Sequence, residues 1–323
     1  MTAPDMTGLR VVVLGGTGFV GSAVADRFVR AGATVRSVSR GGAASVSGVD
    51  VVAADLTRPG AVARAVAGAD VIASLVLYTG SGSYRVGAEH AEAAAEVNVE
   101  VAHAVSGAVG SGGGPTVLWA GSTSQVGAGA GERISVDGSE PDRPTTEYDR
   151  QKCAAEAHVL GAGGISLRLP TVYGRSPGGL DRGVVTAMIR RAVAGQALTV
   201  WGEGGMLRDL VAVDDVARAF VTAAAHAPRL AGRKWVLGSD RGVSVRDLFE
   251  RIAHAVAAHA NRAPVPVVSV PPPAHATDMD LRGLVADPSA FRAVTGWRTD
   301  VDLDDGLAET VRAAAPDGTV RDP

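Results

Sequence analysis

Residues 9–31 read LRVVVLGGTGFVGSAVADRFVRA, and this stretch decides the fold of the chain. The apolar run 9–14 is typical of a buried strand, and after the turn Val20, Val24 and Phe28 share one face of a helix. Glycines in a G-x-x-G-x-x-G turn let backbone N–H groups approach a pyrophosphate, whose charge the helix N-terminus favours. The stretch therefore predicts a dinucleotide-binding unit. The residues expected to contact the dinucleotide are Gly15, Thr17, Gly18, Phe19, Val20 and Gly21.

Short apolar runs alternate with longer helical patterns along the rest of the chain, as parallel strands do when crossover helices join them. The other expected strands of this part are 34–38, 51–53, 71–76, 115–119 and 165–169. The expected helices are 18–31, 61–67, 88–109 and 147–160. The pattern predicts an α/β fold with a doubly wound parallel sheet.

The alternation of strand and helix patterns stops at the Gly/Pro-rich loop 173–183, and we expect a smaller C-terminal domain to begin near there. The segments 210–225 and 234–238 have strand and helix patterns that are expected to return to the large sheet. We predict a dinucleotide-binding domain and a substrate domain. The first consists of 8–169 and 209–239, and the second of 170–208 and 240–323.

Composition excludes several classes of function. The 323 residues include 31 Lys and Arg against 34 Asp and Glu, with no block of like charge, so no nucleic-acid partner is expected. No apolar stretch approaches the ~20 residues that span a bilayer. One cysteine, no secretory leader pattern and scattered histidines predict a cytoplasmic protein without a metal site.

The end of the second strand indicates which dinucleotide binds. An acid there usually accepts the ribose 2′-hydroxyl of NAD, but this chain has Ser39 and Arg40. A hydroxyl and a guanidinium suit a 2′-phosphate, so we predict NADPH over NADH. Asp55 and Leu56 follow the third strand, where they are expected to meet the adenine. An exposed Arg40 and a simple turn at Asp55 are the competing interpretations.

Tyr148 and Lys152 lie one helical turn apart, so an ammonium would lie near the phenol and lower its pKa toward neutrality. Residues 121–126 (GSTSQV) end the fifth strand with hydroxyls that could bond a substrate carbonyl oxygen. Such a pair alone is commonplace. In this order after the glycine turn, the three features predict proton transfer to a carbonyl oxygen.

The chain resembles the extended short-chain dehydrogenase/reductases, whose core is a Rossmann-type sheet. The motifs that carry the resemblance are 169–174 (LPTVYG), 208–210 (RDL), 213–217 (VDDVA) and 295–297 (TGW). More narrowly, 182–191 and 265–273 are similar to the dTDP-4-keto-6-deoxyhexose 4-ketoreductases of actinomycete deoxysugar (antibiotic) pathways. The resemblance implies reduction of a dTDP-linked 4-keto-6-deoxy sugar with NADPH, by a homodimer.

The resemblance also implies roles for individual residues. Thr123, Tyr148 and Lys152 would be the catalytic triad, with Ser124 as the alternative to Thr123 and as a substrate contact. Pro170 and Lys152 would touch the cofactor. The remaining substrate contacts would be Arg208 and Arg282 on the diphosphate and Trp201 on the base, with core packing as the competing interpretation of Trp201. Tyr84 and Arg85, in the loop after the fourth strand, are expected near the sugar, and loop exposure alone would explain them equally well.

Five other functions compete with this one. Dehydratases that resemble this chain place an Asp-Glu pair after the catalytic threonine, whereas Ser124 and Gln125 stand here. An epimerase that retains NAD would share the triad, but Ser39 and Arg40 argue against it. Reduction at C3, a small-ketone reductase and an NADPH-sensing regulator are further alternatives.

Overall fold

The computed structural model describes residues 4–42, 46–80, 86–109, 114–130, 135–181, 183–273 and 282–315. Within them, seven parallel strands form one sheet in the order β13-β7-β5-β4-β1-β2-β3. The strands are β1 (Arg10–Leu14), β2 (Thr34–Ser39), β3 (Val49–Ala53), β4 (Val71–Ser74), β5 (Thr116–Ser122), β7 (Ile165–Leu169) and β13 (Lys234–Val236). The order reverses between β1 and β4, which is the doubly wound arrangement. The predicted fold class is confirmed.

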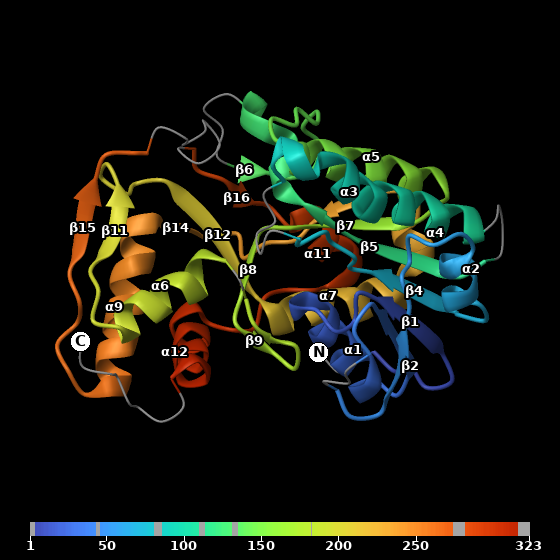
Figure 1. Ribbon diagram of the computed structural model, residues 1–323, viewed down its shortest axis with the longest axis horizontal. Coiled ribbons are helices and arrows are strands. Elements are labelled where there is room, and N and C mark those ends of the chain that lie inside the picture. Colours follow the sequence, from blue (N-terminus) through green and yellow to red (C-terminus); the bar gives the residue numbers. More distant parts are fainter. Residues whose placement is uncertain are drawn as a thin grey trace.

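Helices cover both faces of this sheet (Figure 1). One layer consists of α1 (Phe19–Arg30), α7 (Val213–Ala225) and α11 (Ser289–Thr295), and the other of α2 (Ala61–Val66), α4 (Val101–Val109) and α5 (Glu147–Gly161). The central strands β1, β4 and β5 are largely apolar on both sides, since each of their faces is buried against a helix. A short helix, α8 (Ala227–Leu230), follows α7.

The segment 88–109 is helical along its length, but its hydrogen-bonding pattern changes from one turn to the next. A 3-10 turn (Ala88–His90) and α3 (Ala91–Ala95) lead into a π-helical turn (Glu96–Glu100), and α4 follows directly. A π turn inside a helix often marks a functional position. Here it carries the buried Asn98.

The smaller domain has its own apolar core. Its helices are α6 (Val184–Val193), α9 (Val245–Ala260) and α12 (Leu303–Ala314), and they pack with β11 (Leu198–Trp201) and β15 (Val267–Val270), which pair in parallel. Short strands complete it: β6 (Ser135–Val136) with β16 (Val285–Ala286), and β9 (Arg175–Ser176) with β10 (Gly179–Leu180). Ser244 caps the start of α9, and its hydroxyl accepts the amide N–H of Asp247 at 3.0 Å.

The prediction that the strand of 210–225 returns to the large sheet is wrong. β12 (Leu207–Ala212) pairs instead with β8 (Thr171–Tyr173) and β14 (Gly242–Ser244). Pro170 separates β7 from β8 and has no N–H to continue the ladder, so β8 leaves the sheet and β12 follows it. β13 takes the edge beside β7, as expected for 234–238, and α7 packs against α1.

In the part of the chain that the structure describes, no helix is both long and apolar enough to cross a membrane.

Candidate active site

The glycine turn between β1 and α1 has no room for side chains. Gly15 has φ +81°, and a Cβ on Gly21 would lie 2.2 Å from the carbonyl oxygen of Gly15. A Cβ on Gly16 would lie 2.4 Å from Oγ of Ser37. Gly18 precedes the first turn of α1, and no side chain of the described residues caps that helix. The turn therefore fits a dinucleotide pyrophosphate, which the first-turn N–H groups can bind.

A hairpin from the far half of the sequence covers this turn. Gly178, between β9 and β10, donates its N–H to Oγ of Ser22 at 2.8 Å, and Ser22 donates to Oγ of Ser176 at 3.0 Å. A Cβ on Gly178 would lie 2.7 Å from the carbonyl oxygen of Gly18. The sequence analysis missed this contact, since nothing in the sequence links positions so far apart.

The residues expected around the adenosine lie at the ends of β2 and β3. Ser39 donates its hydroxyl to the carbonyl of Gly41 at 2.7 Å, and Arg40 is exposed. Asp55 accepts the hydroxyl of Thr57 at 2.7 Å and the N–H of Thr57 at 3.1 Å, and these bonds hold the pKa of that carboxyl below its usual range. Burial opposes this shift, and the charges of Arg58 and Arg40 add to it. Asp55 therefore stabilises its own turn, and the charge of Arg40 lies close enough to affect it.

Tyr148 and Lys152 lie in the first half of α5. Lys152 is buried, donates to the carbonyl of Ala120 at 2.8 Å, and has its Nζ 5.8 Å from the ring centre of Tyr148. Burial lowers the pKa of Lys152 to about 8, against an opposing effect of Glu156. The ammonium is thus held between the end of β5 and the tyrosine ring.

The hydroxyl cluster at the end of β5 meets α5. Thr123 is buried and donates to the carbonyl of Leu169 at 3.3 Å, next to Pro170. Ser122 and Ser124 bring their Oγ atoms to 2.8 Å from each other, and Ser124 donates to Oδ1 of Asp149 at 2.5 Å. The structure thus brings the cluster next to the residue that follows Tyr148.

Asp149 is a site residue that the sequence analysis missed. Its side chain is buried, and it also accepts the hydroxyl of Thr146 at 2.6 Å. Thr146 in turn caps α5 by accepting the N–H of Asp149 at 3.2 Å. The signal was present, because an N-cap threonine followed three residues later by an acid is a capping pattern.

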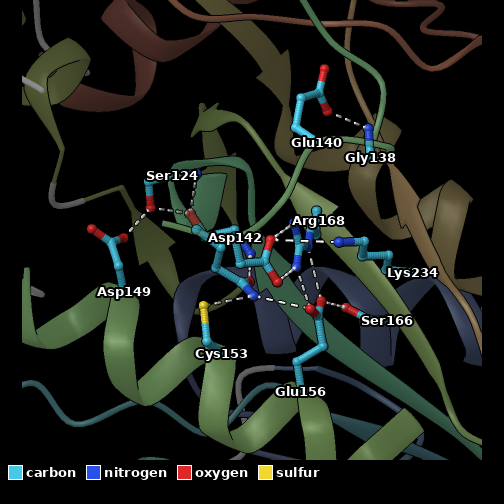
Figure 2. A network of polar contacts seen from close by, with 12 residues as sticks. Ser124, Gly138, Glu140, Asp142, Asp149, Cys153, Glu156, Ser166, Arg168 and Lys234 are labelled. Carbon is cyan, nitrogen blue, oxygen red and sulfur yellow. Dashed lines mark hydrogen bonds and ion pairs between the residues drawn. The ribbon is translucent and has the colours of Figure 1, made fainter. Parts of the chain in front are cut away.

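A buried ion network lies behind the hydroxyl cluster (Figure 2). Arg168 on β7 is fully buried and donates to both oxygens of Asp142, at 2.7 and 2.8 Å, and to Glu156 on α5. Gln125 also donates to Glu156, at 3.1 Å, and Lys234 lies 3.5 Å from Asp142. The network ties the segment before α5 to the sheet. Its sequence signal is the spacing of Glu156, one helical turn after Lys152.

Asn98 connects the π turn to two neighbouring segments. Its Oδ1 accepts the N–H of Tyr78 at 2.8 Å, and its Nδ2 donates to Oε1 of Gln151 at 2.8 Å. Gln151 precedes Lys152, so the π turn connects the end of β4 to the helix that carries the Tyr/Lys pair.

Two of the expected substrate residues lie side by side. The guanidinium of Arg208, on β12, donates a hydrogen bond to the backbone carbonyl of Arg282. The backbone of Arg208 also forms an isolated parallel β-bridge with Leu284. Trp201 is half-buried at the end of β11, in a different small sheet. Tyr84 and Arg85 lie outside the described residues.

Asp209 anchors the strand that carries Arg208. It is buried and accepts the N–H and hydroxyl of Ser239, at 2.9 and 2.8 Å, and the N–H of Ala286 at 3.0 Å. Burial raises the pKa of Asp209 to about 6 against these hydrogen bonds. Among the residues that the structure describes, no cluster of three His, Cys, Asp or Glu side chains could hold a metal ion.

Known proteins share this sequence and fold. A model of the NAD dependent epimerase/dehydratase family matches residues 11–238. The dTDP-L-rhamnose 4-epimerase of Burkholderia thailandensis is 33% identical over 54% of this chain and 47% of its own. The UDP-glucose 4-epimerase of Mycolicibacterium smegmatis is 32% identical over 55% and 58%. The chain thus spans about half the length of these two relatives.

One relative matches along the whole length. The dTDP-6-deoxy-L-talose 4-dehydrogenase (NAD(P)(+)) of Kitasatospora kifunensis is 29% identical over 98% of this chain and 99% of its own. Among solved structures, a UDP-glucuronic acid 4-epimerase from Bacillus cereus in complex with NAD has a TM-score of 0.77 at 18% identity, covering 95% and 99% of the two chains. That likeness concerns the fold.

Proposed function

The chain belongs to the NAD-dependent epimerase/dehydratase family, and we propose that it is an NADPH-dependent reductase of the C4 keto group of a dTDP-4-keto-6-deoxyhexose in deoxysugar biosynthesis. The observation that carries the proposal is the full-length similarity to dTDP-6-deoxy-L-talose 4-dehydrogenase. The oxidation in that name, run in reverse, is reduction of a 4-keto sugar. The hydroxyl cluster, Tyr148 and Lys152 supply groups for this chemistry.

Bound NADPH would supply the hydride. The glycine turn would hold its pyrophosphate, Asp55 and Leu56 would lie at the adenine, and Pro170 would lie beside the nicotinamide half. Ser39 and Arg40 would bind the 2′-phosphate. A charge-assisted hydrogen bond of this kind is worth about 1.5 to 3 kcal/mol, or about 10- to 100-fold in preference over NADH.

The chain's own residues would handle the proton. Tyr148 donates it to the oxygen that becomes an alkoxide, and Thr123 polarises the same oxygen by a hydrogen bond. Lys152 would hold the ribose, and its ammonium lies 5.8 Å from the ring centre of Tyr148, where a positive charge favours the phenolate. Because the pKa of Lys152 is about 8, most of this lysine remains protonated at pH 7.

The small domain would bind the rest of the substrate. A diphosphate needs fixed guanidinium groups. Arg208 would supply one, and its guanidinium donates to the backbone carbonyl of Arg282, whose side chain would supply the second. Trp201 would stack on the nucleotide base. Ser124 would contact the sugar.

A nucleotide-sugar epimerase with retained NAD is the second candidate, favoured by the two 4-epimerases among the relatives. Those matches cover about half of this chain, and Arg40 at the end of β2 favours a 2′-phosphate instead. A C3-ketoreductase would use the same residues on the neighbouring carbonyl.

We also propose a homodimer formed through α4 and α5, which pack side by side on one face of the sheet. Light scattering of the purified protein at several concentrations tests this: a mass of twice 32.6 kDa is expected, and a monomer at all concentrations refutes it.

The direct experiment incubates the protein with dTDP-4-keto-6-deoxyhexoses and either NADPH or NADH. Oxidation of NADPH with formation of a C4 alcohol is expected. A rearranged sugar without net oxidation would favour the epimerase.

A further inference from the structure

The carboxylate of Asp149 accepts hydrogen bonds from two hydroxyl groups, and Asp149 follows Tyr148, the proposed proton donor, in the chain. Ser124 donates to its Oδ1 at 2.5 Å, and Thr146 donates to its Oδ2 at 2.6 Å. Only 2% of Asp149 is exposed, so water does not compete for these bonds. The two contacts fix where the protons of both hydroxyls point.

A count of donors then fixes the direction of the neighbouring bonds. A serine hydroxyl has one proton and two acceptor lone pairs, and an ionised carboxylate only accepts. Ser124 donates its one proton to Asp149 in a hydrogen bond, so Ser122 must be the donor in the 2.8 Å contact between the two serines. Among the residues that the structure describes, nothing takes the second lone pair of Ser124, which can therefore accept from another partner, whereas its proton is already used.

Thr123, between the two serines, differs from both. Its hydroxyl donates to the carbonyl of Leu169 at 3.3 Å, well beyond the usual ~2.7 to 2.8 Å of an O–H···O bond. Its proton is therefore the one in this row that can turn to another acceptor at little cost. A keto oxygen accepts hydrogen bonds, so it can pair with the hydroxyl of Thr123. Ser124 can only accept, so it would pair with a hydrogen-bond donor on the substrate.

We propose that Asp149 is a positioning residue that keeps Ser124 an acceptor, so that Ser124 selects a keto sugar with a free hydroxyl on the carbon next to the keto group. Thr123 and Ser124 are adjacent in the hydroxyl cluster at the end of β5, so the proposal assigns them neighbouring oxygens of the substrate. The inference rests on the proposed function, and it specifies the substrate class within it.

The test compares two dTDP-linked 4-keto-6-deoxyhexoses that differ only by the hydroxyl at C3. We expect the wild-type protein to prefer the hydroxylated sugar by about 3- to 10-fold in kcat/KM, the effect of one hydrogen bond. Ser124→Ala and Asp149→Ala should bring this ratio close to one.

Thr146→Ala is the matched control, because it also removes one hydroxyl from Asp149 but leaves the bond of Ser124 intact. It should melt at a lower temperature, since the cap of α5 is lost, and keep the preference. A ratio unchanged in Ser124→Ala, or equal losses in Ser124→Ala and Thr146→Ala, would overturn the inference. Ser124→Ala and the control decide the matter even if Asp149→Ala does not fold.

Calorimetric binding separates this inference from the proposed function. The Kd values of dTDP and of the two reduced sugars are measured on the same variants, with dTDP binding expected to be equal in all of them. If the wild type reduces both keto sugars and binds both reduced sugars with equal Kd, only the role of Ser124 is overturned. Absence of dTDP binding by the wild type would overturn both.

Discussion

Replacing Glu156 with glutamine should destabilise the fold by disturbing the buried ion network. The carboxylate accepts Nε of Arg168 at 3.0 Å, Oγ of Ser166 at 2.5 Å and Nε2 of Gln125 at 3.1 Å, and it also accepts Nη2 of Arg168. Glutamine has one oxygen and would turn an NH₂ group toward donors. Arg168, which is fully buried, would keep Asp142 as its remaining carboxylate.

Removal of one partner from a buried ion pair costs about 3 to 5 kcal/mol, because the other charge stays in the interior. Asp142 still holds two nitrogens of Arg168, so we expect the lower value, about 3 kcal/mol. At roughly 2 to 4 °C per kcal/mol for a large domain, the melting temperature should fall by roughly 6 to 12 °C.

The assay is thermal and urea unfolding of the wild type and Glu156→Gln. Asp304→Asn is the matched control, since both oxygens of Asp304 bond Arg251 at 2.8 Å but the side chains are 62% and 39% exposed. An exposed pair is worth less than about 1 kcal/mol. If Glu156→Gln loses no more stability than this control, burial of the network has no energetic consequence and the reasoning is wrong.

Three further predictions concern the site. Tyr148→Phe should lower kcat by about 10²- to 10⁴-fold with unchanged NADPH affinity, measured by steady-state kinetics and cofactor fluorescence; full activity would exclude its role as proton donor. Arg40→Ala should weaken NADPH binding about 10- to 100-fold and leave NADH unaffected, and equal losses for both cofactors would contradict the 2′-phosphate contact. The raised pKa of Asp209, about 6, means that the folded state binds this proton more tightly than the unfolded chain. The stabilisation is complete below pH ~4 and is lost as pH rises through about 6, so denaturant titrations should show wild type losing up to ~3 kcal/mol relative to Asp209→Asn over that range. Parallel pH profiles of the two proteins would refute this.

The local parts of the fold could be predicted from the sequence. The run 9–31 contains its own strand, turn and helix signals, and the alternation of strand and helix patterns predicted a doubly wound parallel sheet, although not the order of its strands. β12 could not be placed, because its pairing depends on where β8 leaves the sheet after Pro170. The hairpin on Ser22 depends on contact between segments far apart in sequence.

The geometry of the candidate site likewise has a local part and a long-range part. Tyr148 and Lys152 are one turn apart on a helix, so their proximity is a local property. The link from Ser124 to Asp149 joins a strand end to a helix, and the sequence contains only the capping half of that arrangement, at Thr146. The directions of hydroxyl protons follow only from the folded geometry.

The most direct test of the central claim uses NADPH that carries deuterium on the transferred position of the nicotinamide. With a dTDP-4-keto-6-deoxyhexose as substrate, we expect one NADPH to be oxidised for each sugar reduced, with the deuterium at C4 of the product. A product that contains no deuterium, or an epimerised sugar formed without oxidation of NADPH, would contradict the assignment as a 4-ketoreductase.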